Sequence, residues 1–256
     1  MRPILTALPA FNDNYIWCLS CEGHALVVDP GDASVVENWL QHNQLTLDYI
    51  LVTHHHADHI GGLHTLKNRH TATTLGPDED IDGLDRILKG GERIDLGDFG
   101  QAVVMAVPGH TRAHIAWHLP ASDLLFPGDT LFSAGCGRLF EGTAAQMHAS
   151  LQSLATLPDS TLICCTHEYT LANLRFAMAV EPGNPAVVER LRAVEELRNR
   201  DQPSLPVSLA QERRYNPFLR CAIPEVVAAT SLQAGHPLAP NEATFTALRE
   251  WKDHFR

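Results

Sequence analysis

Short apolar segments recur through the first two-thirds of the chain, and several of them end in a histidine or an aspartate. Their length and their β-branched and aromatic side chains are typical of strands, and turn residues separate them. The predicted strands are residues 15–21, 24–31, 47–54, 101–109, 113–119, 123–129 and 161–167. Because these segments alternate with turns and with single helices such as 34–43, they predict two stacked sheets with helices outside, an α/β or α+β layered fold.

The pattern changes near residue 169, where amphipathic segments separated by Pro-rich turns begin. They predict helices over 169–180, 184–200 and 241–255. The Asn-Pro pairs at 184–185 and 216–217 predict helix starts, since proline is favoured at the first helical position. We therefore expect a strand-rich catalytic domain over residues 1–170 and a helical domain over residues 171–256.

The net charge of the chain bears on its binding partners, and its cysteines bear on the cellular compartment. Thirty Asp and Glu against nineteen Lys and Arg give a formal net charge of −11 at pH 7, which argues against nucleic-acid or membrane partners. The start of the chain makes a poor secretory signal, because Pro3 and Pro9 interrupt its apolar stretch. Cys18 and Cys21 lie on a predicted strand and are expected to be buried, unpaired thiols. We expect a cytoplasmic monomer.

One stretch, "THHHADHIGG" at 53–62, follows directly on a predicted strand, and three more predicted strands end in a histidine or an aspartate. Loops at strand ends commonly carry binding groups. The candidate ligands are His54, His56, Asp58, His59, His110, Asp129 and His167. Seven ligands exceed the four of one tetrahedral zinc but suit two ions that share a carboxylate, with zinc, iron or manganese as the metal.

A chance cluster is the competing interpretation, because the chain holds fifteen histidines. A single histidine at a strand end is more often a satisfied polar residue than a ligand. His55 is expected to point away from its neighbours, and His114 and His118 are expected to be structural or to support the ligands. The spacing of the run, together with three further strand-end residues, favours the metal site.

The run resembles the H-x-H-x-D-H signature of the metallo-β-lactamase superfamily. Other segments closely resemble the glyoxalase II family, the hydroxyacylglutathione hydrolases, and the resemblance extends over nearly the whole chain. These segments are "VPGHTRAHIAWH" (107–118), "FPGDTLFSAGCGRLFEGTAAQM" (126–147), "CTHEYTLANLRFA" (165–177), "NPFLR" (216–220) and the terminal "LREWKDHF". The resemblance implies an αββα sandwich in the α/β class with a binuclear site, followed by a C-terminal helical domain that helps to bind glutathione.

The resemblance also implies a role for each ligand. His54, His56 and His110 would hold one metal ion. Asp58, His59 and His167 would hold the second, and Asp129 would bridge both. The expected cofactors are two divalent ions per chain, zinc in the first place, with iron or manganese as alternatives.

The substrate residues implied by the resemblance are Arg138, Phe140, Tyr169, Arg249 and Lys252. Arg138, Arg249 and Lys252 would contact the glycine carboxylate of glutathione, and Tyr169 would contact the tripeptide. Phe140 stands where the family often has a tyrosine, and Ala113 replaces a usual glycine. Without the resemblance, Arg249 and Lys252 would be interpreted as part of a solvated helix face. Arg138 would be interpreted as a residue that covers its loop, and Tyr169 as a core residue.

The activity that the resemblance implies is hydrolysis of S-D-lactoylglutathione to D-lactate and glutathione, the second step of methylglyoxal detoxification. A metal-bound hydroxide would be the nucleophile, with Asp129 bridging the ions and Asp58 orienting the hydroxide. One alternative is a persulfide dioxygenase of the same superfamily, which uses a single iron. Another is a non-catalytic metal-binding protein, and lactonase or β-lactamase activity would leave the helical tail without a role.

Overall fold

The computed structural model describes residues 2–255, which divide into two compact units that interleave along the chain. Unit 1 comprises the residues up to 106 together with 113–128 and 164–167, and unit 2 comprises 107–112, 129–163 and the residues from 168 on. The boundary expected at residue 170 divides the sequence into two continuous segments. The two units are instead defined by which residues pack together, so each combines segments from both sides of other points in the chain. That boundary stays a prediction.

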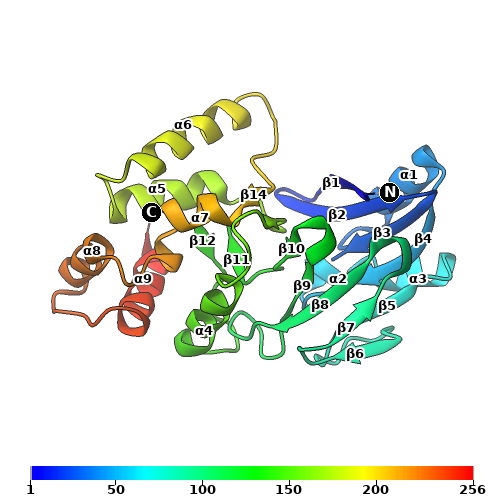
Figure 1. The fold of residues 1–256 in the computed structure, drawn as a ribbon, viewed down its shortest axis with the longest axis horizontal. Helices are drawn as coiled ribbons and strands as arrows, with labels where there is room; N and C mark the ends of the chain where they lie inside the picture. Colours follow the sequence, from blue (N-terminus) through cyan, green and yellow to red (C-terminus); the bar gives the residue numbers. More distant parts are fainter. Residues whose placement is uncertain (1, 256) are drawn as a thin grey trace. The chain divides into compact units, whose positions relative to one another are not determined.

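Six strands of unit 1 form one mixed sheet in the order β1-β2-β3-β4-β5-β6 (Figure 1). They are β1 (Ile4–Ala10), β2 (Asn14–Cys21), β3 (His24–Val28), β4 (Thr46–Leu51), β5 (Thr73–Pro77) and β6 (Arg86–Leu88). The first three pair antiparallel and the later ones parallel. Glu22 and Gly23 both have positive φ, 50° and 85°, and form the predicted turn between β2 and β3.

Helices α1 (Ala33–Asn43) and α3 (Leu63–Arg69) pack on one face of this sheet, and the short α2 (Ala57–Ile60) precedes α3. The α1 helix begins where the Asp32 side chain accepts a hydrogen bond from the backbone N–H of Ser34. Its buried Val36 packs into a core with Ile50 of β4 and Leu66 of α3. This burial of an apolar helix face fixes the chain on both sides of residues 53–59.

The second set of strands in unit 1 runs antiparallel in the order β10-β9-β8-β7. The strands are β7 (Arg93–Asp95), β8 (Gln101–Ala106), β9 (Ile115–Leu119) and β10 (Leu124–Phe126), with 3₁₀ turns η1 (Gly97–Phe99) and η2 (Pro120–Ser122). Trp117 of β9 is fully buried, and its Nε1 donates to the Val52 carbonyl at 3.0 Å. The two sheets of unit 1 therefore contact each other, as the strand pattern predicts.

Unit 2 is mostly helical. It contains α4 (Ala144–Leu154), α5 (Thr170–Val180), α6 (Pro185–Arg198), α7 (Leu209–Tyr215), α8 (Pro224–Ala234) and α9 (Glu242–His254), and the short strands β11 (Leu131–Phe132), β12 (Gly135–Cys136), β13 (Leu162–Ile163) and β14 (Val207–Ser208). Helix α9 contacts α4 and α8, and α5 contacts α6 (Figure 1). Phe176, Phe218 and Phe245 are fully buried at the centre of this core.

Two sequence-based expectations need correction. Asn216-Pro217 starts the short 3₁₀ turn η3 (Pro217–Leu219) instead of an α-helix, because Pro224 forces a new start at α8 a few residues later. Of the predicted strand 161–167, only Leu162–Ile163 is a strand. Residues 164–167 belong instead to unit 1, where Tyr15 donates its backbone N–H to the Thr166 carbonyl.

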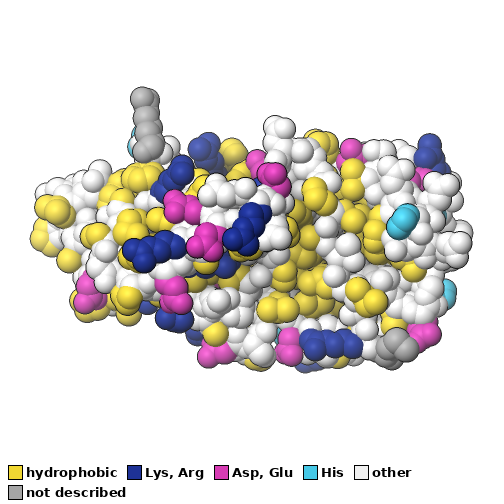
Figure 2. All heavy atoms as spheres, turned by 90° about the horizontal axis from the view of Figure 1, so that it is seen from above, with side chains coloured by type: hydrophobic (Ala, Val, Ile, Leu, Met, Phe, Trp, Pro, Cys, Tyr) yellow, Lys and Arg dark blue, Asp and Glu magenta, His cyan; other side chains and the backbone are white. Residues whose placement is uncertain are grey.

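All six cysteines are free and buried, which confirms the expected unpaired thiols. Within residues 2–255, none of the helices combines the length and the apolar character that spanning a membrane requires. On the face drawn in Figure 2, Lys and Arg side chains lie next to Asp and Glu side chains. That face therefore carries both signs of charge side by side, unlike the basic stripe that follows a nucleic-acid backbone.

Candidate functional site

Asp29, buried at the end of β3, organises the start of the histidine run. Its carboxylate accepts from the Thr53 backbone N–H at 2.8 Å and from Thr53 Oγ1 at 2.7 Å. His59 Nδ1 lies 3.0 Å from Asp29 Oδ2, the arrangement in which an imidazole donates to a carboxylate. This contact fixes the ring of His59 and directs its Nε2 toward Asp58, the arrangement typical of a histidine that ligates a metal.

Asp58, His59 and His167, predicted to hold one metal ion, lie together in unit 1. Their ligand atoms all lie within 4.8 Å of one another. Asp58 Oδ2 is 3.6 Å from His59 Nε2 and 3.4 Å from His167 Nε2. His167 Nδ1 lies 2.8 Å from Asp13 Oδ1, and Asn14 donates to Asp58 at 3.0 Å. Each of these two imidazoles and the carboxylate is oriented by a hydrogen bond to a neighbouring side chain. Together they are a donor set suited to zinc, iron or manganese.

The electrostatics of this cluster favour an ionised carboxylate. The hydrogen bond from His167 holds the pKa of Asp58 well below its usual range, and His59 and Asn14 act in the same direction. Burial opposes this shift without overcoming it. The Asp58 carboxyl is therefore ionised throughout the neutral range.

His54 and His56 lie beside this cluster, whereas His55 is engaged elsewhere. The fully buried His54 stacks on His114 with 4.6 Å between ring centroids and 19° between the planes, and its centroid is 4.7 Å from that of His56. His55 Nδ1 is 2.9 Å from Glu79 Oε2. The contact with His54 gives His114 a supporting role in packing.

In unit 2, His110 and Asp129 form a second group of candidate ligands. Both are buried, with His110 Nε2 3.4 Å from Asp129 Oδ2. His110 Nδ1 lies 2.9 Å from the Arg138 carbonyl, to which it donates. A Cβ at Gly137 would lie only 1.9 Å from the Asp129 carbonyl oxygen, so a glycine is required for this close approach.

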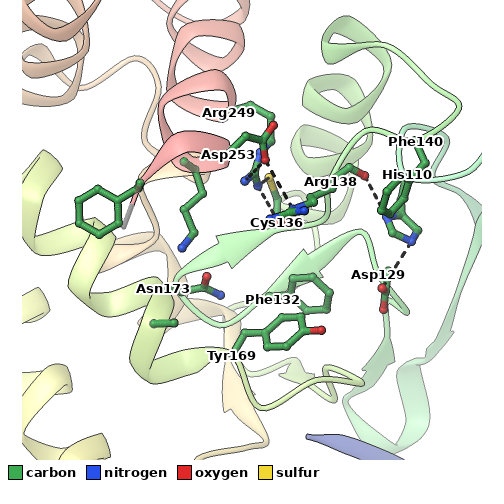
Figure 3. A pocket seen from close by; sticks show the side chains of 13 residues that line it. His110, Asp129, Phe132, Cys136, Arg138, Phe140, Tyr169, Asn173, Arg249 and Asp253 are labelled. Atoms are coloured by element: carbon green, nitrogen blue, oxygen red, sulfur yellow. Dashed lines mark hydrogen bonds and ion pairs between the residues drawn. The ribbon is translucent and has the colours of Figure 1, made fainter. Parts of the chain in front are cut away.

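His110 and Asp129 also line a cavity of about 420 Å³ in unit 2 (Figure 3). The cavity includes all five predicted substrate residues: Arg138, Phe140, Tyr169, Arg249 and Lys252. Sequence reasoning missed several other lining residues, namely Phe132, Cys136, Ala172, Asn173, Asp253 and Phe255. One cavity therefore combines two candidate metal ligands with three cationic side chains.

Arg249 is the most constrained of these cations. It is only 4% exposed, which makes the solvated-face alternative wrong for this residue. Its Nη1 donates to the Cys136 carbonyl and its Nη2 to Asp253 Oδ1, both at 2.9 Å. The guanidinium carbon lies 5.1 Å from the Phe218 ring centroid. These contacts make Arg249 part of the cavity wall.

Lys252 and Arg138 are more accessible. The Lys252 ammonium lies 5.4 Å from the Phe176 ring centroid, and burial lowers its pKa from the usual value, with Arg249 and Arg138 adding to the shift. The Arg138 side chain is 67% exposed, and its Nε is 3.8 Å from Asp253 Oδ1. Both cations are therefore available to an anionic ligand.

Tyr169 and Phe140 are the most exposed aromatic residues of the cavity wall, which also includes Phe132 and Phe255 (Figure 3). The Tyr169 ring packs edge-on against Phe132 at 5.4 Å and remains 38% exposed, so Tyr169 is not a core residue. Phe140 is 63% exposed, and its ring lies 5.2 Å from that of His110. The cavity therefore offers cationic and aromatic side chains to an anionic ligand beside His110 and Asp129.

Family-wide sequence comparisons divide the chain into two matches. Residues 15–167 match the family described as the metallo-beta-lactamase superfamily. Residues 168–255 match the family described as hydroxyacylglutathione hydrolase C-terminus.

Curated relatives match along the full length. The chain is 52% identical to the hydroxyacylglutathione hydrolase of Aeromonas hydrophila, with 100% of both chains covered. It is 51% identical to that of Pseudomonas aeruginosa, with 98% of this chain and 99% of the relative covered.

Solved structures support the fold. ETHE1 from Myxococcus xanthus aligns with a TM-score of 0.66 and 26% identity over 97% of this chain and 98% of its own. The BLEG-1 B3 metallo-beta-lactamase aligns with a TM-score of 0.65 and 21% identity, covering 84% of this chain and 99% of its own. The expected α/β sandwich with a C-terminal helical part is confirmed.

Proposed function

The chain belongs to the hydroxyacylglutathione hydrolase family within the metallo-beta-lactamase superfamily, and we propose that it hydrolyses S-D-lactoylglutathione and related 2-hydroxyacyl-glutathione thioesters. The products are D-lactate and glutathione, as in the second step of methylglyoxal detoxification. The observation that carries this proposal is the cavity in which His110 and Asp129 occur with Arg138, Arg249 and Lys252.

We propose that two divalent ions are held by the residues predicted from the sequence. His54, His56 and His110 would hold one ion, Asp58, His59 and His167 would hold the other, and Asp129 would be shared between them. Support comes from the donor chemistry: His59, His110 and His167 each have Nδ1 at an oxygen acceptor, which leaves Nε2 as the ligand atom. Zinc is the first candidate, with iron and manganese as alternatives.

When bound, the two ions supply a water of lowered pKa and polarise the thioester carbonyl. Asp58, kept anionic by its neighbours, would accept a hydrogen bond from that water and so orient it. Arg138 and Lys252 attract the carboxylates of glutathione, while Phe140 and Tyr169 flank the tripeptide. The leaving group is the glutathione thiolate, which needs no strong general acid.

The relatives at 51–52% identity favour this activity over the two alternatives. A persulfide dioxygenase would bind one iron and consume oxygen, and a non-catalytic protein would bind metal without turnover. We further propose a cytoplasmic location, which the free buried thiols support, and a monomeric state.

The decisive experiment measures hydrolysis of S-D-lactoylglutathione and metal content on the same purified sample. We expect turnover together with about two ions per chain. Absence of turnover in the metal-loaded protein would refute the proposed activity. A reproducible single iron with oxygen consumption on glutathione persulfide would replace it by the dioxygenase.

A further inference from the structure

Residues 129–140, here called the pocket segment, supply much of the cavity wall, including Asp129, Phe132 and Arg138. The regular structure of this segment is limited to the two-residue strands β11 and β12, which pair Leu131 with Cys136 and Phe132 with Gly135. An isolated hairpin is marginally stable at best, and one this short has few ladder hydrogen bonds. The segment therefore depends on contacts outside itself.

The main contact is Glu212 of α7, a fully buried residue that does not line the cavity. Its carboxylate accepts from Ser133 Oγ at 2.7 Å and from the Ala134 backbone N–H at 2.8 Å, both at the tip of the hairpin. It also accepts from the Tyr215 hydroxyl at 2.8 Å and from Asn216 Nδ2 at 2.9 Å. Four donors converge on one group, and a carboxylate has enough lone pairs to accept from all of them.

Two amide side chains hold the carbonyl groups of the same tip. Asn216 Nδ2 donates to the Phe132 carbonyl at 3.1 Å and to the Gly135 carbonyl at 3.0 Å. Asn173 Nδ2 donates to the Ser133 carbonyl at 3.1 Å. The tip thus obtains from the helices of unit 2 the hydrogen bonds that a longer ladder would supply.

Ala134 shows that these contacts impose a conformation. Its φ of 55° lies in the left-handed region, which is strained for a residue other than glycine. Such a conformation persists where the surroundings determine it, and the Glu212 hydrogen bond is made by the N–H of this residue. The strained tip therefore depends on Glu212.

The tip is continuous with the groups that would meet a substrate. Phe132 packs against Tyr169, and the Cys136 carbonyl receives the Arg249 guanidinium. A shift of the tip would displace both contacts, and Arg138 follows two residues after Cys136. Misplacement of binding groups by about 1 Å can cost two orders of magnitude in rate.

We propose that Glu212 is a positioning residue, which fixes the hairpin tip and through it the cavity wall that binds the glutathione part of the substrate. This inference rests on the proposed function for its ligand, but it concerns a residue that does not line the cavity. Hydrogen-bond geometry, rather than charge, carries the effect.

The test compares Glu212→Ala and Glu212→Gln with Glu181→Ala in the full-length protein. Glu181 is the matched control, because it is a buried carboxylate of unit 2 that pairs with Arg220 at 2.8 Å and lies outside the cavity wall. The readouts are glutathione affinity by calorimetry, KM and kcat for S-D-lactoylglutathione, and the melting temperature.

For Glu212→Ala we expect a rise of about tenfold in the glutathione Kd and in KM, equivalent to about 1.4 kcal/mol. Glu212→Gln should recover most of the affinity, because its carbonyl oxygen can keep the Ala134 and Asn216 donors while the Ser133 and Tyr215 hydroxyls accept from its amide. Glu181→Ala should lower the melting temperature but keep the wild-type Kd.

The proposal is overturned if Glu212→Ala binds glutathione within twofold of wild type, or if Glu181→Ala weakens binding as much. If Glu212→Ala does not fold, Ser133→Ala removes a single donor, and an unchanged Kd there would overturn the proposal equally. Wild-type protein that neither binds glutathione nor hydrolyses its thioester refutes the proposed function instead, so the two failures are distinct.

Discussion

Arg249 and Lys252 lie three residues apart on α9, yet replacing each by alanine should have different consequences. Arg249 is 4% exposed and donates to the Cys136 carbonyl and to Asp253, whereas Lys252 contacts aromatic rings through its ammonium. We expect Arg249→Ala to lower stability as well as substrate binding. Lys252→Ala should affect substrate binding alone.

The magnitudes follow from these contacts. Arg249→Ala leaves the buried Cys136 carbonyl without its donor, which costs about 1–3 kcal/mol. The Asp253 side chain is 37% exposed, so water replaces much of the lost pair and that contact counts for about 0–1 kcal/mol. The sum, about 2–4 kcal/mol with the lost packing, lowers the melting temperature by roughly 5–15 °C in a chain of this size.

Lys252→Ala removes a half-buried cation. Within residues 2–255 the Lys252 ammonium contacts aromatic rings and makes no side-chain hydrogen bond that would be lost with it. Its cation–π contact contributes about 0.5–1 kcal/mol, so stability should change little. Loss of about 1 kcal/mol of substrate binding raises KM about fivefold at unchanged kcat, since this interaction is equal in ground and transition states.

Thermal unfolding without substrate and steady-state kinetics on the same preparations test both statements. The reasoning is refuted if Arg249→Ala has the same melting temperature as the wild-type protein and differs from it only in KM. It is equally refuted if Lys252→Ala lowers the melting temperature as much as Arg249→Ala. In either case burial would not separate the roles of the two cations.

Three further predictions concern the metal ligands, the cavity rim and acid stability. Asp129→Ala should lose both its metal and nearly all turnover, whereas His55→Ala should keep both. Elemental analysis and kinetics on each variant test this, and equal loss of metal from the two variants would refute the proposed ligand set. Phe140→Tyr adds a hydroxyl at an exposed rim position and should lower KM about two- to twelvefold, since one hydrogen bond contributes about 0.5–1.5 kcal/mol; an unchanged KM would contradict this. Lys67 lowers the pKa of Asp85 to about 2, so the stabilisation from Asp85 is complete above about pH 4 and lost as the pH falls through 2. Urea unfolding of Asp85→Asn and wild type should therefore differ at pH 6 and converge near pH 2.

The strands that end in candidate ligands were predictable because they are apolar runs with turn residues behind them. β1 was not predicted, since Pro3 and Pro9 interrupt its pattern. Pro9 is tolerated because β1 is an edge strand, where a missing N–H need not break a ladder. The start of α4 carried a usable signal, because Thr143 and Gln146 form a capping box.

The supporting residues of the candidate site were harder to predict. Asp29 lies at the end of the predicted strand 24–31, just before its Pro-Gly stop, and the rule applied to the other strand ends would have included it. Asp13 reaches His167 over 154 positions, a pairing that no local pattern specifies. The burial of Arg249 was not predictable either, because an arginine on an amphipathic helix looks the same whether it contacts water or a neighbouring carbonyl.

The contribution of residues 164–167 to unit 1 has a consequence for synthesis. Trp17 of β2 donates its indole N–H to the Cys165 carbonyl, 148 positions later. At translation rates of about 5–20 residues per second, roughly 7–30 s separate the two partners on the ribosome. The contacts of residues 164–167 with β2 therefore form late in elongation, and closing so long a loop has an entropic cost that grows only slowly with loop length. A nascent chain stopped before residue 164 would leave the Tyr15 backbone N–H and the Trp17 indole N–H without these partners, so the start of β2 completes its hydrogen bonds only when the late segment arrives.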